Sequence, residues 1–85
     1  MTVHIPSPLL SYTKSKQVNA NGATLGEMFV DLERQFPGIR FRVIDEQEHL
    51  REHLQIFVNQ RIAKDLSEQV KPEDEVRIIA AISGG

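Results

Sequence analysis

The residues with the clearest chemical potential are the last two of the chain, Gly84 and Gly85. At a glycine usage of roughly 7%, two terminal glycines arise by chance in about one chain in 200. From Ile82 through Ser83 to Gly85 the chain can extend about 13 Å at roughly 3.3 Å per residue. Because glycine has no Cβ atom, the last two residues can thread a channel too narrow for side chains. The tail is therefore suited to deliver a carboxylate deep into another protein.

The carboxylate expected at Gly85 defines the chemistry of this tail. An α-carboxyl has an ordinary pKa of roughly 3.5, so it is ionised at neutral pH and can attack a nucleotide phosphate as a weak nucleophile. We expect Gly85 to undergo acyl activation, with Ile82, Ser83 and Gly84 threading the channel of an enzyme that supplies ATP. The alternative is a frayed terminus without a role.

A second motif, His49-Leu50-Arg51-Glu52-His53, matches the H-x-x-E-H spacing of inverted zinc proteases. That chemistry requires both histidines on one helix, a further ligand and a substrate cleft, and the sequence predicts no helix there. We therefore reject a metal site and expect a polar approach to the strand at Leu54, with Glu48, Arg51 and Glu52 in exposed ion pairs of small energy. The chain has no cysteine, which excludes disulfides, thiolate metal sites and a cysteine nucleophile.

Length and composition limit the remaining classes of function. The 85 residues suffice for one small domain, residues 1–85 with a tail at 82–85, but not for a core plus an enclosed catalytic cleft. Hydrophobic residues make up 40% and charged residues 26%, as in folded globular proteins. The net charge of -2 is spread along the chain, which disfavours nucleic acid and anionic membranes as partners. No apolar run approaches the roughly 18 residues of a membrane span, so we expect a cytoplasmic protein.

One helix is clearly predicted, beginning at Thr24. The Thr24 hydroxyl can accept a hydrogen bond from the N–H of Glu27, whose carboxylate can reach back to the Thr24 N–H in a capping box. Pro37-Gly38 ends the helix, and a further short helical turn is expected over residues 39–44, with Phe41 and Val43 or Ile44 in the core. The apolar face of the main helix follows helical spacing at Leu25, Met28, Phe29, Leu32 and Phe36.

Alternation of apolar and polar residues predicts the strands. A short strand at residues 2–6 is followed by a loop at 9–13 and an edge strand at 15–20. After the helix come a strand at 54–58, a turn at Asn59-Gln60 with a short return through Ile62, core contacts from Leu66 and Val70, and a last strand at 75–81. This order predicts an α+β, ubiquitin-like β-grasp fold, with a mixed sheet of four to five strands packed on one main helix.

The same alternation points three residues of the last strands away from the helix: Phe57, Arg77 and Ile79. Outward apolar residues on neighbouring strands form an exposed patch. We expect this patch to dock a partner, the alternatives being scattered surface apolarity or cover by the loop at residues 9–13. His4 is expected to face outward as an ordinary strand histidine, and Glu73-Asp74-Glu75 to form a solvated turn.

Several segments together resemble the ubiquitin-like sulfur-carrier family, which includes the small subunit of molybdopterin synthase, the thiamin sulfur carrier and the carrier of a cysteine-biosynthesis branch. Residues 5–10 and 50–59 look most like the cysteine branch. Ala80 and Gln60 depart from the family, where proline and glycine are frequent. The segments that carry the resemblance are Thr24-Leu25-Gly26-Glu27, Pro37-Gly38-Ile39, Ile56-Phe57-Val58-Asn59, Asp74-Glu75-Val76 and Ser83-Gly84-Gly85.

The resemblance implies a carrier that is not itself an enzyme and binds no permanent cofactor. A ubiquitin-activating-type adenylating enzyme would use ATP to form an acyl-adenylate at Gly85, and a sulfurtransferase or other sulfur donor would convert it to a thiocarboxylate. A sulfur-accepting synthase would then use the sulfur to make cysteine or a related amino acid, and a metalloprotease would release the product. Three alternatives stay open: the small subunit of molybdopterin synthase, a protein modifier joined to lysines through Gly85, and a pure binding module.

Overall fold

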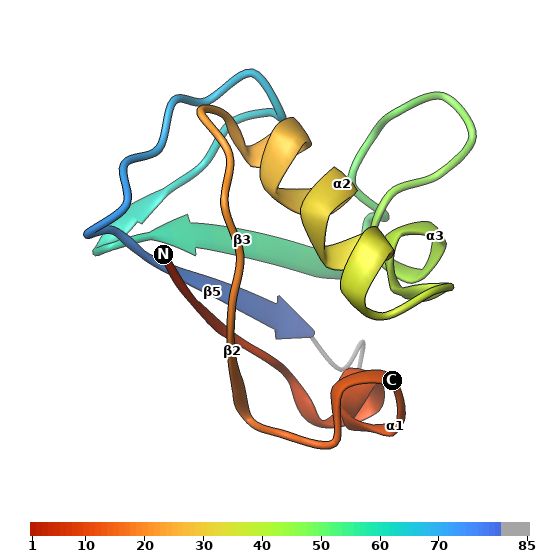
Figure 1. The fold of residues 1–85 in the computed structure, drawn as a ribbon. Coiled ribbons are helices and arrows are strands. Elements are labelled where there is room, and N and C mark those ends of the chain that lie inside the picture. Colours follow the sequence, from red (N-terminus) through yellow and green to blue (C-terminus); the bar gives the residue numbers. More distant parts are fainter. Residues whose placement is uncertain (81–85) are drawn as a thin grey trace.

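The computed structural model describes residues 1–80, which form a five-stranded mixed sheet with its helices mainly on one face (Figure 1). The strand order is β2-β1-β5-β3-β4. The elements are β1 (Thr2–His4), the 3-10 helix η1 (Ser7–Leu9), α1 (Leu10–Thr13), β2 (Gln17–Asn19), α2 (Leu25–Gln35), α3 (Ile39–Val43), β3 (Leu54–Val58), β4 (Arg61–Ile62) and β5 (Glu75–Ala80). This arrangement confirms the predicted α+β sheet and its single main helix.

The last strand lies at the centre of the sheet. β5 runs parallel to β1 and antiparallel to β3, with Val76 opposite both Val3 and Val58. Its alternate residues Val76 and Ile78 are buried, as the alternation predicted. The strand was expected to reach Ala81, which lies outside the described residues.

Helix α2 begins and packs largely as predicted. The Thr24 hydroxyl accepts a hydrogen bond from the Glu27 N–H at 3.2 Å, which caps the helix. The expected reciprocal bond is shifted by one residue, because the Glu27 carboxylate accepts from the Ala23 N–H at 2.9 Å rather than from Thr24. Of the predicted apolar face, Leu25, Met28, Phe29 and Leu32 are buried and Phe36 is half-buried at the C-cap.

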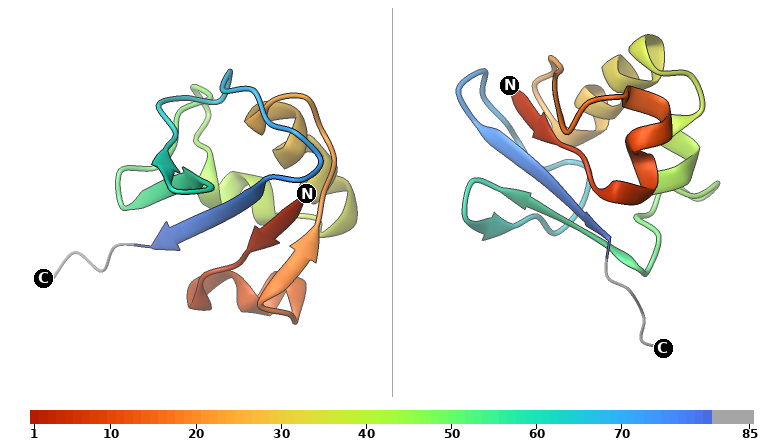
Figure 2. Two further views of the ribbon diagram at one scale, coloured as in Figure 1. Left: turned by 90° about the vertical axis from the view of Figure 1, so that its left-hand side faces the viewer. Right: turned by 90° about the horizontal axis from the view of Figure 1, so that it is seen from below.

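The buried core lies between α2, α3 and the inner face of the sheet. The loop between β4 and β5 contributes Val70, which is buried, and Leu66, which is half-buried against the core, as expected. Figure 2 shows α2 and α3 behind the sheet in one view, while β1, β5 and β3 present their other face. Among residues 1–80 there is no helix long and apolar enough to cross a membrane.

Two expectations about local structure were wrong. Residues 9–13, predicted as a loop, contain the end of η1 and the whole of α1. Pro8 fits there because a proline is tolerated in the first turn of a helix, where its missing N–H is not needed. Phe41 does not reach the core but is 56% exposed, whereas Val43 and Ile44 are buried. In a five-residue helix only one side can face the core, and Ile39 and Val43 occupy it.

A carboxylate joins the end of α2 to the start of α3. The Glu33 carboxylate accepts hydrogen bonds from the N–H groups of Gly38 at 2.9 Å and Arg40 at 3.0 Å. Gly38 has a φ of 100°, a conformation that residues with a Cβ rarely adopt. These two backbone N–H groups hold the pKa of Glu33 below its ordinary value. The ionised side chain is therefore part of the turn that sets the position of α3.

The hydrogen bonds from the Gly38 and Arg40 N–H groups to the Glu33 carboxylate predict a pH-dependent contribution to the free energy of unfolding. A pKa that is lowered by folding stabilises the protein above the unfolded-state pKa of about 4.3, and this contribution is lost as the pH falls through the folded-state value. We expect Glu33→Gln to be less stable than the wild type at pH 7, with the difference shrinking below about pH 4. Urea unfolding at several pH values measures this. Glu46→Gln, in an exposed loop, is the control. A difference in stability between Glu33→Gln and the wild type that does not change with pH would contradict a stabilising role for the ionised Glu33 carboxylate.

Candidate functional site

The predicted tail residues Ile82, Ser83, Gly84 and Gly85 lie outside the described residues, so the structure locates only the base from which they extend. Ala80, the last residue of β5, pairs with Leu54 at the start of β3. β5 is paired with β3 from Val76 to Ala80 and with β1 from Glu75 to Arg77. The base of the tail is therefore anchored in the most extensively paired strand of the sheet.

The outer face of the sheet carries one continuous row of side chains across all five strands. Phe57 lies opposite Ile62 on one side and Arg77 on the other, so two of the predicted docking residues are cross-strand neighbours. Arg77 in turn lies opposite His4. From β4 to β2 the row is Ile62, Phe57, Arg77, His4 and Gln17.

The outer-face patch consists of the two apolar residues of this row, Phe57 and Ile62, together with Ile79, which lies two residues beyond Arg77 on β5. Ile62 is 51% exposed, Ile79 is 42% exposed and Phe57 is half-buried. Ile79 lies opposite Gln55, two residues along β3 from Phe57, so Phe57 and Ile79 are diagonal neighbours. The outward direction predicted for Phe57, Arg77 and Ile79 is confirmed, whereas their role in docking stays a prediction.

Ile62 is a member of the patch that the sequence interpretation missed. The signal was present, because a two-residue turn at Asn59-Gln60 pairs Val58 with Arg61 and therefore Phe57 with Ile62. Asn59 adopts a positive φ of 57°, which glutamine at the next position does not. The hairpin prediction is thus confirmed, and the turn is not the type I′ form, which needs positive φ at both positions.

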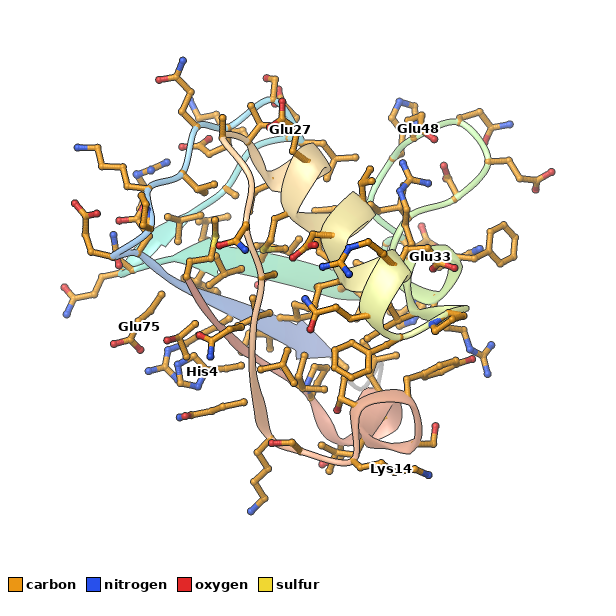
Figure 3. All side chains as sticks on the ribbon, viewed as in Figure 1. His4, Lys14, Glu27, Glu33, Glu48 and Glu75 are labelled. Atoms are coloured by element: carbon orange, nitrogen blue, oxygen red, sulfur yellow. The ribbon has the colours of Figure 1, made fainter. Side chains whose placement is uncertain are left out.

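The polar end of the row is an ion-pair cluster. His4 Nε2 lies 2.8 Å from Glu75 Oε1 (Figure 3). The same carboxylate oxygen is 3.6 Å from an Arg77 terminal nitrogen. Gln17 Nε2 lies 3.5 Å from His4 Nδ1. His4 therefore faces outward as expected. Glu75 contacts both His4 and Arg77, and Arg77 lies opposite Phe57 of the outer-face patch.

The acidic turn before β5 is more structured than the solvated turn we expected. The Asp74 carboxylate accepts hydrogen bonds from Asn59 Nδ2 at 3.1 Å and from the Lys71 N–H at 2.9 Å, and these bonds hold the pKa of Asp74 low. The Asn59 side-chain oxygen in turn accepts from the Glu75 N–H at 3.0 Å. The turn is thus fastened to the β3–β4 hairpin, which fixes where β5 begins.

The H-x-x-E-H segment lies in the loop before β3 and not on a helix. His49, Glu52 and His53 are exposed, and the His49 N–H donates to Asp45 Oδ1 at 3.0 Å. Within residues 1–80 no three or more histidine, aspartate or glutamate side chains are grouped to hold a metal ion. The segment is the polar approach to β3 that was predicted. The expected ion pairs differ, because Glu48 pairs with Arg40 of α3, and Arg51 and Glu52 form no ion pair within residues 1–80.

Comparison with known proteins gives a consistent result. A family model described as the ThiS family matches residues 3–85. The chain is 35% identical, over 91 aligned positions, to the sulfur carrier protein CysO of Mycobacterium tuberculosis, an alignment that covers 100% of this chain and 98% of that protein. The residues that carried the resemblance, Ser83-Gly84-Gly85 included, lie within the matched range.

Solved structures agree on the fold. The structure is similar to a crystal structure of a BexX/CysO complex from Amycolatopsis orientalis, with a TM-score of 0.90 and 35% identity over 99% of this chain and 98% of that one. It is also similar to SAMP1 of Haloferax volcanii, with a TM-score of 0.80 and 26% identity over 100% and 98% of the two chains. The β-grasp fold predicted from the sequence is thereby confirmed.

Proposed function

The chain belongs to the ThiS family, and on this premise we propose that it is a sulfur carrier protein whose Gly85 bears the sulfur. The observation that carries the proposal is the end-to-end similarity to sulfur carrier protein CysO, combined with the glycine pair at positions 84 and 85. The proposed pathway is the biosynthesis of cysteine or a related amino acid. Because the cycle consumes ATP, the proposal places the carrier in the cytoplasm.

The proposed cycle has two balanced chemical steps. A Gly85 carboxylate oxygen attacks the α-phosphorus of ATP, pyrophosphate leaves, and the carbonyl carbon becomes part of a mixed anhydride with AMP. A hydrosulfide sulfur then attacks that carbon, the bond to the AMP oxygen breaks, and AMP leaves with the electron pair. The product is a thiocarboxylic acid, which releases its proton to water to give the thiocarboxylate, and no oxidation state changes when the donor is hydrosulfide.

The chain contributes position rather than catalysis to these steps. β5 provides a fixed base at Ala80, and the glycines provide a narrow segment that can enter an enzyme's channel. The ATP and the catalytic groups belong to the adenylating enzyme, so the carrier acts as its co-substrate. The absence of cysteine also means that no internal thiol can capture the activated acyl group.

The outer-face patch is the proposed docking surface for the adenylating enzyme. Apolar side chains exposed next to an arginine are typical of the centre of a protein interface. The solved BexX/CysO complex supports the expectation that such a carrier associates with other proteins. Further proposed partners are a sulfurtransferase or other sulfur donor, the sulfur-accepting synthase, and a metalloprotease that releases the product.

Polar substitution of the patch tests its role in docking. We expect Phe57→Ser with Ile79→Ser to weaken binding to the adenylating enzyme by about tenfold or more. The melting temperature should fall only slightly, because Ile79 is 42% exposed and Phe57 is half-buried. Calorimetric titration and thermal unfolding measure the two quantities. Normal binding together with a large loss of stability would assign these side chains to folding instead.

The lack of cysteine provides a direct test of the carrier function. The protein is incubated with a candidate adenylating enzyme, ATP and sulfide, and is then treated with iodoacetamide at mildly acidic pH. A thiocarboxylate is the only strongly nucleophilic sulfur that this chain can present, so a single alkylation on the C-terminal peptide is expected. The reaction without ATP is the control. Failure to label with any candidate enzyme would reject the carrier function.

A second candidate function is protein modification through Gly85. It is favoured by the similarity to a protein named small archaeal modifier protein 1. The carboxyl group would then form an isopeptide bond with a lysine amine after the same adenylation. Conjugates of higher mass in cells that express a tagged carrier would support modification, and their loss on deletion of Gly85 would assign the linkage.

A further inference from the structure

An open groove of about 530 Å³ lies at one end of the molecule, between η1, α3 and the loop that leads into β3. Its apolar wall comes from η1 and α3, and its polar wall from α3 and the loop. The described residues that line it, here called the tail-base groove, are Pro8, Leu9, Phe41, Arg42, Arg51 and His53.

The groove lies at the end of the sheet from which the tail extends. His53 directly precedes Leu54, which pairs with Ala80, and β1, which runs parallel to β5, leads directly into η1. In Figures 1 and 2 the arrowhead of β5 points toward the side of the molecule where η1 and α1 lie. Five residues after Ala80 can span about 16 Å at roughly 3.3 Å per residue. An enzyme that binds Gly85 and the base of the tail at Ala80 is therefore within reach of the groove.

Two arginine side chains in the groove are held in place by their Nε atoms. Arg51 Nε donates to the Phe41 carbonyl at 2.9 Å, and its guanidinium lies 4.7 Å from the centre of the Phe41 ring. Arg42 Nε donates to the Tyr12 hydroxyl at 2.9 Å. The terminal nitrogens of both guanidinium groups donate to no residue within 1–80. They are thus fixed forks, the geometry that binds a carboxylate through two parallel hydrogen bonds.

Arg42 and Arg51 differ in this respect from the other arginines of the chain. Each of the other four faces a carboxylate: Arg34 faces Asp31, Arg40 faces Glu48, Arg61 faces Glu68 and Arg77 faces Glu75. Arg42 and Arg51 form no such ion pair with a residue in the described part of the chain. Asp45 and Glu52 line a neighbouring hollow that Arg51 and His53 also line. The described residues that line the groove itself include two arginines and no carboxylate, so the groove is locally basic in a protein of net charge -2.

We propose that the tail-base groove receives an acidic segment of the adenylating enzyme. A carboxylate of that segment would bind the Arg42 and Arg51 forks, and an adjoining apolar side chain would pack on the exposed Phe41 ring. The inference rests on the proposed function, because it assumes that such an enzyme acts at Gly85. The groove and the outer-face patch would together orient the carrier so that its tail enters the enzyme.

Enzyme kinetics test the groove. For the double variant Arg42→Gln with Arg51→Gln, we expect the KM for the carrier to rise about tenfold or more, with kcat for adenylation within about twofold of the wild type. Arg34→Gln is the matched control, since Arg34 is paired with Asp31 on α2, and it should change neither constant. Thermal unfolding checks that both variants are folded. An unchanged KM for the folded double variant would overturn the proposal.

A titration without enzyme keeps the groove testable even if no adenylation occurs. The probe is the peptide N-acetyl-Asp-Glu-Phe-Glu-Asp-amide, added to isotopically labelled carrier. We expect the Nε–Hε resonances of Arg42 and Arg51 to shift with saturation, and the lysine-containing counterpart of the peptide to leave them unchanged. Equal shifts with both peptides, or none with either, would overturn the proposal. By contrast, the absence of carrier-dependent ATP–pyrophosphate exchange with the wild type would reject only the proposed function.

Discussion

Deletion of Gly85 is expected to lower the rate of adenylation by at least about a hundredfold while the fold stays intact. Removal of one residue withdraws the carboxylate by about 3.3 Å. When reacting groups must be aligned, a misplacement of even 1 Å can cost roughly a hundredfold in rate. Carrier-dependent ATP–pyrophosphate exchange measures the loss, and thermal unfolding should show no change, because the deleted residue lies beyond β5.

Substitution of Gly84 distinguishes the effect of tail length from the effect of channel width. Gly84→Val keeps the length of the tail but adds a β-branched side chain, which would obstruct a narrow channel and restrict the backbone. We expect a comparable loss of adenylation, whereas Ser83→Ala, which removes only a hydroxyl, should stay close to the wild type. If Gly84→Val is adenylated normally, the channel is wide and the glycines are not required for threading.

Truncation of the α2 core face should produce the largest loss of stability. Phe29 and Leu32 are 0% exposed between the helix and the sheet. Phe29→Ala should cost roughly 3 to 5 kcal/mol and Leu32→Ala roughly 2 to 5 kcal/mol, from a total free energy of unfolding of about 5 to 15 kcal/mol. Each substitution removes buried apolar contacts and leaves a cavity.

A matched control lies on the same helix. Val30 is 61% exposed, so Val30→Ala should change the free energy of unfolding by no more than about 0.5 kcal/mol. Urea unfolding of the three variants gives the comparison. Losses below about 1 kcal/mol at both Phe29 and Leu32 would show that the assigned helix face is not the core face.

The sequence was sufficient to predict those elements whose signal is local and repeated. The cap at Thr24 and the apolar spacing along α2 both agree with one buried face, and the alternation in β3 and β5 fixes which residues face inward. Short elements were predicted less well. α1 has only four residues, less than the span over which helical periodicity can be recognised, and the exposed Phe41 was misplaced because five-residue α3 offers a single core-facing side.

The candidate sites depend more strongly on topology than on local sequence. Phe57, Arg77 and Ile79 were predicted to face outward from alternation alone, but the continuous row from Ile62 to Gln17 depends on which strands are neighbours. The tail-base groove combines residues from η1, α3 and the loop before β3. No spacing in the sequence links Arg42 to Arg51. Arg51 returns to α3 because the loop after α3 is closed by the Ile44–Leu50 bridge and by the hydrogen bond from the Arg51 N–H to the Val43 carbonyl.

The most direct measurement of the central claim is the mass of the C-terminal peptide after incubation with the adenylating enzyme, ATP and a sulfur source. We predict an increase equal to the difference between one sulfur atom and one oxygen atom, located at Gly85 and dependent on ATP. An adenylated carrier whose C-terminal peptide never gains sulfur, in the presence of an active sulfur donor, would contradict it.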